Sequence, residues 1–166
     1  MTLSNGDLTV TSAAGASFRS IRSTVSKSSG KWYWEVTPLV DAVNRTPIGM
    51  GTSAMSLASF VGAAASSWSY YNNAGGAGRK INAGSLTAYG LTYVAGDVIG
   101  VYMDCDAGTL GFTKNGADQG QAFSNLAGTI FAACSVFDDL QSFTANFGAT
   151  AFAGAPPSGY NSGLYS

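Results

Sequence analysis

The stretch GDVIGVYMDCDAGTLGFTKNG, residues 96–116, decides the fold that this sequence predicts. Between 99 and 103 an aliphatic side chain occupies every second position, which is the period of a β-strand. Asp106-Ala107-Gly108 then favours a turn, because aspartate accepts hydrogen bonds from nearby backbone and glycine tolerates a positive φ. The alternation resumes at Leu110, and Asn115-Gly116 is the strongest short signal for a β-hairpin with a type I′ turn. The stretch therefore predicts three consecutive antiparallel strands joined by tight turns.

Short segments on both sides of this stretch have the same character. They are rich in aromatic and β-branched residues and are separated by glycine, proline or asparagine. Residues 54–66 fit either one short helix or an irregular loop. Gly49 and Gly51 lie in an expected strand and predict that another segment approaches it closely. About a dozen short strands with almost no helix predict an antiparallel β-sandwich. The further strands are expected at residues 18–25, 31–37, 48–53, 68–72, 79–81, 86–93, 120–123, 129–137 and 141–147.

The segment KWYWEVT, residues 31–37, identifies the expected core. Successive side chains of a strand point to opposite faces, so Trp32, Trp34 and Val36 share one face. Burying an indole removes a large apolar area from water, and both tryptophans are therefore predicted in the core. Glu35 lies on the opposite face of the same strand.

Length and composition fit one folded domain. The chain has 166 residues, 46% of them hydrophobic and 12% aromatic, which is enough for a buried core. Only 10% of the residues are charged and the net charge is −1, so the basic footprint of nucleic-acid binding is missing. No secretory signal opens the chain, and no apolar run approaches the ~20 residues that cross a bilayer. We therefore expect a soluble protein without a signal peptide, a transmembrane segment or a nucleic-acid partner.

The residue types exclude most catalytic chemistry. Histidine is absent, which removes the Ser-His-Asp and Cys-His arrangements and the commonest zinc ligand. Glycoside hydrolysis needs two carboxylates about 5–9.5 Å apart, and Glu35 is the sole glutamate. Cys105 and Cys134 are expected to be two small buried thiols, although a disulfide between them stays open. The sequence therefore predicts no enzyme and no cofactor, with a glycan-active enzyme as the minor alternative.

One segment begins like a calcium-binding loop. Residues 104–108, DCDAG, have the pattern D-x-D-x-G, but Asn115 occupies the place of the bidentate glutamate that such a loop needs. A turn capped by aspartate hydrogen bonds explains the same pattern. We therefore predict no metal site.

Four blocks of sequence resemble those of one domain family. GKWYWEV (30–36), IGMGTS (48–53), the stretch 96–116 and ANFGATAF (145–152) follow one another in the order typical of the SPRY domain family. The resemblance spans residues 16–153 and implies an all-β fold. That fold is a bent antiparallel β-sandwich of two sheets, similar to the concanavalin-like jelly roll of the legume lectins.

The resemblance also divides the chain. Residues 1–15 are expected to form an N-terminal strand and loop leading into the SPRY-like sandwich of residues 16–153. Residues 154–166 are expected to form an extended C-terminal tail over the surface, because they contain Pro156-Pro157 and several glycines.

The family resemblance implies a binding function. SPRY domains are non-enzymatic modules that hold their partners on loops at one end of the sandwich. The short sequence rich in Gly, Ser and Ala resembles the SPRY modules of bacteriophage tail fibres, receptor-binding appendages and capsids. This implies a place in the virion, where the partners would be other virion proteins or a host surface protein or glycan. A homo-oligomer is left open.

Loop residues are the candidate contacts, since exposed aromatic and amide side chains on loops suit recognition. Tyr70 and Tyr71 are adjacent in an expected strand, so one of them is expected to point into the core. The candidate ligand-binding residues are Asn44, Arg45, Tyr70, Tyr71, Asn72, Asn73, Arg79, Asp138 and Asp139.

A purely structural role is the main alternative. A decoration or assembly protein of the virion would use its loops to contact neighbouring subunits. A large exposed apolar patch would favour that role, whereas a concave loop end lined by tyrosine, asparagine and arginine would favour ligand recognition.

Overall fold

The computed structural model describes residues 1–13, 15, 17–40, 46–72, 76–137 and 140–164. These residues form fourteen strands and no helix, and none of them belongs to a helix that could cross a membrane. The strands are β1 (Thr2–Ser4), β2 (Thr9–Thr11), β3 (Arg19–Lys27), β4 (Lys31–Val40), β5 (Ile48–Gly51), β6 (Ser67–Tyr71), β7 (Ala77–Asn82), β8 (Ser85–Leu91), β9 (Ile99–Asp104), β10 (Thr109–Lys114), β11 (Ala117–Phe123), β12 (Ile130–Val136), β13 (Ser142–Asn146) and β14 (Asn161–Ser162).

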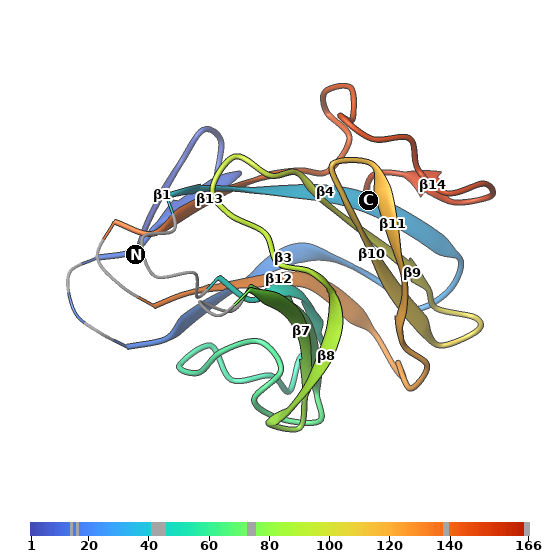
Figure 1. Cartoon of the computed structure of the whole chain (residues 1–166), viewed down its shortest axis with the longest axis horizontal. Coiled ribbons are helices and arrows are strands. Elements are labelled where there is room, and N and C mark those ends of the chain that lie inside the picture. Colours follow the sequence, from blue (N-terminus) through green and yellow to red (C-terminus); the bar gives the residue numbers. More distant parts are fainter. Residues whose placement is uncertain (14, 16, 41–45, 73–75, 138–139, 165–166) are drawn as a thin grey trace.

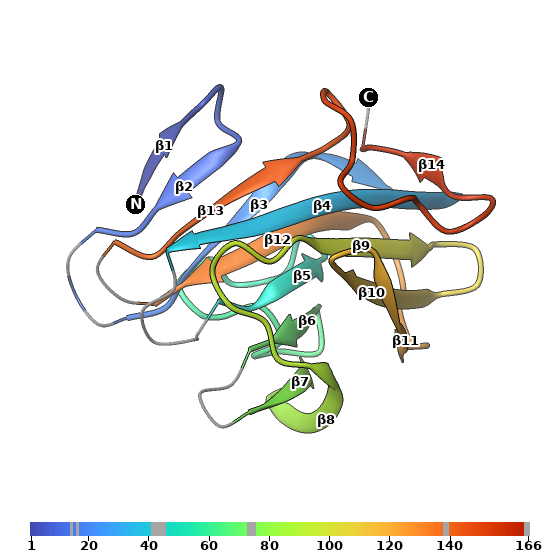
Figure 2. The same ribbon diagram turned by 45° about the horizontal axis from the view of Figure 1, so that its top comes forward.

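Two sheets pack face to face, as Figures 1 and 2 show. The eight-stranded sheet has the order β1-β2-β13-β4-β9-β10-β11, and β14 also pairs with β4. The six-stranded sheet has the order β3-β12-β5-β6-β7-β8. Every pairing is antiparallel except that of β14 with β4. The all-β antiparallel sandwich predicted from the sequence is confirmed.

The meander β9-β10-β11 forms as its sequence predicts. In the first turn, Asp104 Oδ1 accepts hydrogen bonds from the N–H groups of Asp106 (3.1 Å) and Ala107 (3.0 Å). The D-x-D-x-G pattern is therefore an aspartate-capped turn. In the second turn, β10 and β11 are joined by two residues, Asn115 (φ 50°) and Gly116 (φ 80°). Both have a positive φ, as the two central residues of a type I′ turn require.

The core lies between the sheets. Trp34 and Val36 are buried there with Val101 and Phe112 of the same sheet, while Trp68 is contributed by the facing sheet. Because apolar side chains of both inner faces interdigitate, the alternation along each strand decides which residues are buried. Trp34 was predicted in this core and lies there.

Trp32 differs from its expected burial. It is only partly buried and packs against the edge of the core. The ammonium group of Lys27 lies 3.8 Å from the centre of one ring of this indole. Trp32 stands at the second residue of β4, where the sandwich ends and a charged side chain can cover the ring.

The connection from β5 to β6, residues 52–66, is an irregular loop and contains no helix. It covers the outer face of the six-stranded sheet, where Val61 N donates a 2.8 Å hydrogen bond to the buried Ser135 Oγ. A Cβ on Gly51 would overlap the side chain of Met55. The predicted close approach at Gly51 is therefore confirmed, and it lets this loop lie directly on the sheet.

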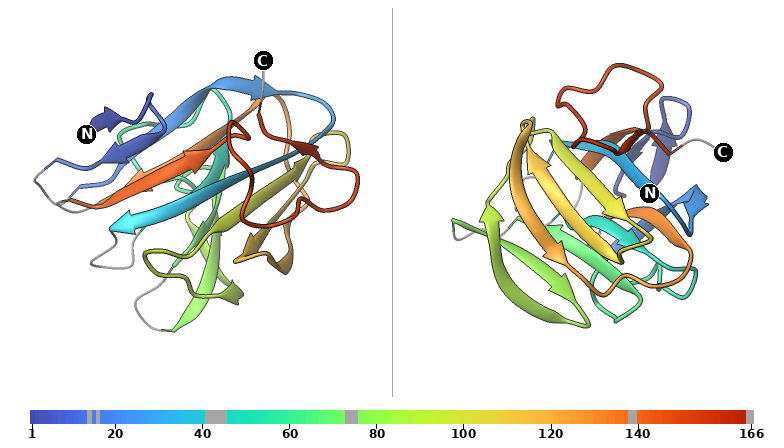
Figure 3. Two further views of the ribbon diagram at one scale, coloured as in Figure 1. Left: turned by 90° about the horizontal axis from the view of Figure 1, so that it is seen from above. Right: turned by 90° about the vertical axis from the view of Figure 1, so that its right-hand side faces the viewer.

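Both terminal segments join the eight-stranded sheet. The β1-β2 hairpin extends it beyond β13, with Val10 opposite both Leu3 and Phe143. The segment after β13 crosses the outer face of the same sheet, as Figure 3 shows, and ends in β14 beside β4. There the ring of Phe152 meets that of Tyr33 edge to face, with centroids 5.0 Å apart.

Candidate functional site

One end of the sandwich, which we call the loop end, is where β4, β6, β8 and β12 finish and β5, β7, β9 and β13 begin. The antiparallel pairing brings these strand ends together towards the left of Figure 2. The sequence placed its candidate residues in or beside the connections between these strands. Five of them lie outside the described residues, namely Asn44, Arg45, Asn73, Asp138 and Asp139.

Two of the remaining candidates, Tyr70 and Asn72, are fully buried. Tyr70 follows the alternation of β6 into the core, and its hydroxyl donates a hydrogen bond to the carbonyl of Leu91. Burial raises the pKa of Tyr70 to about 12, which keeps the phenol protonated as a donor. These two residues therefore shape the loop end from inside, and the expectation that they contact a ligand is corrected.

Tyr71 and Arg79 are the described candidates that reach the surface. They face each other directly across β6 and β7, on the side of the sheet opposite to the core. Adjacent residues of a strand point to opposite faces, so the burial of Tyr70 leaves Tyr71 on the outer face. As the sequence predicted, one of the two tyrosines lies in the core, and that residue is Tyr70.

An apolar groove begins at Tyr71. This outer groove has a volume of about 260 Å³ and lies between the loop 52–66 and the outer face of β6, β7 and β8. Ile81 is buried at its base, while Leu86 is 48% exposed. The main residues of the outer groove are Phe18, Pro47, Phe60, Tyr71, Ile81 and Leu86.

Aromatic contacts fix one wall of the outer groove. The ring of Phe18 lies 5.0 Å from that of Phe60 and 4.6 Å from that of Phe137, measured between centroids. Phe18, Phe60 and Leu86 were not among the candidate residues that the sequence indicated. No local pattern distinguishes them, because they come from segments far apart in the chain and meet only through the pairing of the six-stranded sheet.

Arg79 places a positive charge beside the outer groove. Its Nε is buried and has no hydrogen-bond partner among the described residues. The ion pairs between described residues join Lys31 to Asp104 and Lys114 to Asp97, so neither of them neutralises Arg79. A guanidinium in this state favours an anionic or hydrogen-bond-accepting group.

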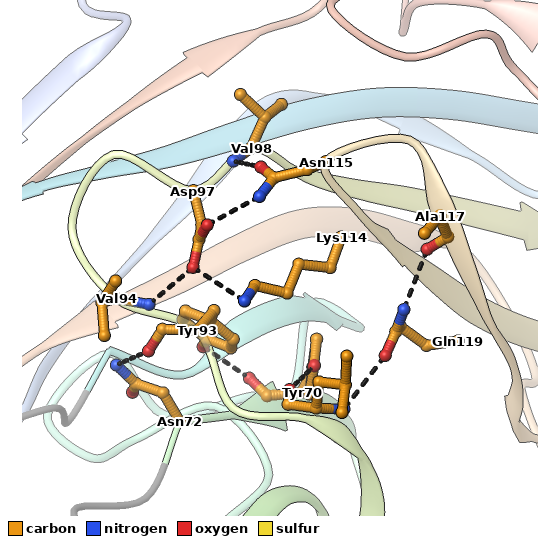
Figure 4. Close-up of polar contacts among 11 residues, drawn as sticks. Tyr70, Asn72, Tyr93, Val94, Asp97, Val98, Lys114, Asn115, Ala117 and Gln119 are labelled. Atoms are coloured by element: carbon orange, nitrogen blue, oxygen red, sulfur yellow. Dashed lines mark hydrogen bonds and ion pairs between the residues drawn. The ribbon is translucent and has the colours of Figure 1, made fainter. Parts of the chain in front are cut away.

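A buried polar network holds the loop end together, as Figure 4 shows in part. Asn72 Oδ1 accepts a 2.9 Å hydrogen bond from Thr46 N, and Asn72 Nδ2 donates to the carbonyl of Tyr93 at 3.3 Å. The hydroxyl of Tyr93 donates to the carbonyls of Thr46 and Tyr70. These bonds fix the start of β5 against the end of β6, and thereby the strand ends beside the outer groove.

Asp97 fixes the connection between β8 and β9. Figure 4 shows its carboxylate accepting bonds from Val94 N (2.9 Å) and Asn115 Nδ2 (2.7 Å), with Lys114 Nζ at 3.2 Å. Burial acts to raise the pKa of Asp97, but these hydrogen bonds and the Lys114 charge outweigh it and hold the pKa below its ordinary value of 3.8.

We expect Asp97 to make stability depend on acid pH. Its folded-state pKa is depressed, so its contribution is complete at neutral pH and is lost as pH falls from about 5 through the folded-state pKa. Urea unfolding of the wild type and Asp97→Asn across acid pH measures this. The difference between their unfolding free energies should shrink as the pH falls. A difference that stays constant down to about pH 2 would contradict the assignment.

The cysteines carry free thiols. The disulfide left open by the sequence is therefore not formed. Burial, followed by the charges of Asp106 and Asp104, raises the pKa of Cys105 to about 11, and burial also raises the pKa of Cys134. Both thiols stay protonated at neutral pH and are poor nucleophiles.

The fold and the loop end together define a β-sandwich module whose described surface features suit binding. The chain belongs to the SPRY domain family, whose sequence profile matches residues 31–150. SPRY domains mediate protein–protein interactions and are in general non-catalytic.

Curated relatives match only a small part of their own length. The probable ATP-dependent RNA helicase ddx1 of Dictyostelium discoideum is 35% identical over 104 residues, which are 63% of this chain and 12% of that protein. The dual specificity protein kinase splA of the same organism is 30% identical over 77% of this chain and 5% of its own. The ATP-dependent RNA helicase Ddx1 of Drosophila melanogaster is 31% identical over 81% of this chain and 18% of its own.

Solved structures share the fold at low sequence identity. A human SPRY domain superposes with a TM-score of 0.76 at 18% identity, covering 90% of this chain and 96% of that domain. The SPRY domain of human HERC1 superposes with a TM-score of 0.72 at 15% identity, covering 87% of this chain and 91% of its own.

Proposed function

We propose that the chain binds a partner protein through the outer groove together with Tyr71 and Arg79. The observation that carries the proposal is the placement of an apolar groove beside a guanidinium that no described carboxylate neutralises. The fitting occupant is a peptide segment with an apolar side chain for the groove and a neighbouring aspartate or glutamate for Arg79. Buried aromatic and arginine side chains are the residues that dominate protein interfaces.

The five candidate residues outside the described part of the chain are proposed as additional contacts. Asn44, Arg45, Asn73, Asp138 and Asp139 belong to connections between strands whose ends meet at the loop end. We propose them as further contacts that select among partners, because variable loops on a rigid scaffold commonly carry specificity.

The outer groove and Arg79 indicate the chemistry of a partner and not its identity. A place in a phage particle, recognition of a host glycan and a decoration role stay predictions from sequence resemblance alone. The curated relatives are proteins of Dictyostelium discoideum and Drosophila melanogaster, and their names describe helicases and a kinase.

Selection of peptides from a random display library tests the proposed function. Peptides that combine an apolar and an acidic residue should be enriched, and their affinities can be measured by fluorescence anisotropy. Tyr71→Ala and Arg79→Ala should each weaken binding about tenfold or more, as expected for central interface residues. The effect of Arg79→Ala should shrink at high salt, because ionic screening weakens the pairing that it removes.

Matched controls separate recognition from folding. Tyr160→Ala removes a tyrosine from the outer face of the other sheet, and Lys31→Ala removes a cation at the opposite end of the sandwich. Both should leave affinity unchanged. Peptides without acidic residues, or affinities that Tyr71→Ala and Arg79→Ala do not alter, would refute the proposal.

A further inference from the structure

The two long sides of the sandwich are built differently. On one side the edges of the sheets are tied together, since Lys80 Nζ donates to the carbonyl of Ala122 and Leu91 N donates to Gln119 Oε1 at 3.0 Å. On the other side β3 is the edge of the six-stranded sheet, and a crevice separates it from the β1-β2 hairpin and β13.

This edge crevice leads from the surface into the core. Its outer part has a volume of about 340 Å³, and its inner part, which shares several residues with it, one of about 60 Å³. Trp34, Val36 and Phe143 line the inner part. The apolar residues of the outer part are Leu3, Leu8, Ile21, Val25, Phe147 and Leu164.

The size of the edge crevice sets the size of a possible occupant. An engineered apolar cavity of about 150 Å³ binds benzene. The outer part, at about 340 Å³, is larger than such a cavity and accepts a molecule with two fused rings.

Trp34 supplies an unused hydrogen-bond donor. Its indole Nε1 is buried and has no partner among the described residues, although the side chain lines the edge crevice. The other two indoles are both bonded, Trp32 Nε1 to the carbonyl of Ser29 at 2.7 Å and Trp68 Nε1 to Asn125 Oδ1 at 3.0 Å. A buried N–H without a partner is uncommon in folded proteins and calls for an acceptor.

Two other polar side chains of β3 that line the edge crevice, those of Ser23 and Arg22, already make hydrogen bonds. Ser23 Oγ donates to the carbonyl of Val25 at 2.7 Å and accepts from Ala132 N at 3.1 Å. Arg22 Nη1 donates to the carbonyl of Thr52 at 3.1 Å, in the loop on the outer face of the sheet. This hydrogen bond of Arg22 is therefore made outside the edge crevice. Asp7 and the exposed Thr24 also line the outer part, and the Trp34 N–H is the buried donor without a partner among the described residues.

We propose that the edge crevice binds a small uncharged apolar molecule carrying one hydrogen-bond acceptor oxygen. The apolar body fills the space between β3 and the eight-stranded sheet, and the oxygen accepts the Trp34 N–H. This site is separate from the outer groove, so its test is independent of the proposed protein-binding function.

Two probes of nearly equal shape test the acceptor. 2-Acetylnaphthalene has a carbonyl oxygen, whereas 2-ethylnaphthalene has none. The ketone should bind about three- to tenfold more tightly, the expected contribution of one hydrogen bond. In ¹H–¹⁵N spectra the ketone should move the Trp34 indole signal more than those of Trp32 and Trp68, with Trp34→Phe identifying the signal. Equal affinities, no binding, or a Trp34 signal that does not move would each overturn the proposal.

A variant that narrows the edge crevice tests the location. Ala145 lines its inner part from β13, and Ala145→Phe should weaken binding of the ketone at least tenfold. Ala88→Phe places the same side chain on the exposed face of β8 and should have no effect. Equal effects of the two variants would overturn the location. The spectra of the wild type decide the question independently if Ala145→Phe does not fold.

Discussion

Replacing Trp34 with alanine is expected to lower the free energy of unfolding by about 3–5 kcal/mol. The indole is fully buried between the two sheets, in contact with the core of both. Alanine removes its apolar area and leaves a cavity that strands held in register on both sides cannot close. Urea unfolding followed by tryptophan fluorescence and circular dichroism measures the loss, with linear extrapolation to water.

Trp32→Ala is the matched control. It removes the same side chain from the same strand, two residues away, where the indole is only partly buried and its ring is covered by Lys27. The loss of stability should be clearly smaller than for Trp34→Ala, because less area returns to water. Equal losses, or a loss below about 1 kcal/mol for Trp34→Ala, would show that Trp34 does not hold the sheets together.

The parts of the fold that local patterns govern were predictable. Turn chemistry fixed both ends of β10, because an aspartate before glycine and an Asn-Gly pair each favour one backbone geometry. The two-residue period placed Trp34 and Val36 in the core together. Such signals need only a few neighbouring residues, and the structure has the turns and the buried face that they predict.

The candidate site was less predictable, for a physical reason. Alternation shows that Tyr70 and Tyr71 point to opposite faces but not which face is the core. The pairing of β6 with β5 decides it, since Tyr70 stands opposite Ile48, whose side chain is fully buried. The walls of the outer groove depend on the same long-range pairing, so among the described residues of this proposed site only Tyr71 and Arg79 were candidates from the sequence.

The sequence predicted an extended C-terminal tail over the surface, but no local signal showed that the segment after β13 would lie on the outer face of the eight-stranded sheet. Glu35 lies 119 positions before Gly154, yet its Oε1 accepts a hydrogen bond from that residue's N–H at 2.8 Å. Oε2 accepts from Ala153 N at 2.9 Å, and the hydroxyl of Tyr33 donates to Oε1 at 2.9 Å. This carboxylate is only 4% exposed, because the C-terminal segment lies over it.

Glu35→Ala is therefore expected to lower the free energy of unfolding by about 2–4 kcal/mol. The substitution removes an ionised acceptor and leaves the N–H groups of Ala153 and Gly154 and the hydroxyl of Tyr33 without their partner. Buried donors that lose their acceptor are costly, so the C-terminal segment should detach from the sheet. Hydrogen exchange of the amides at 153 and 154 should then be faster, while the amides of the β9-β10 pair keep their protection relative to global stability.

Asp118→Ala provides the control for this prediction. Asp118 also accepts a tyrosine hydroxyl, that of Tyr102 at 2.7 Å, and a backbone N–H, that of Gly120 at 2.9 Å, but it does so on the exposed surface. Water replaces those bonds when the carboxylate is removed, and the loss should stay within about 1 kcal/mol. If the two variants lose equal stability, or if exchange at 153 and 154 is unchanged in Glu35→Ala, the carboxylate does not hold the C-terminal segment in place. A large loss confined to Glu35→Ala would instead show that one buried hydrogen-bonded carboxylate holds residues 153 and 154 on β4, in addition to the pairing of β14 with that strand.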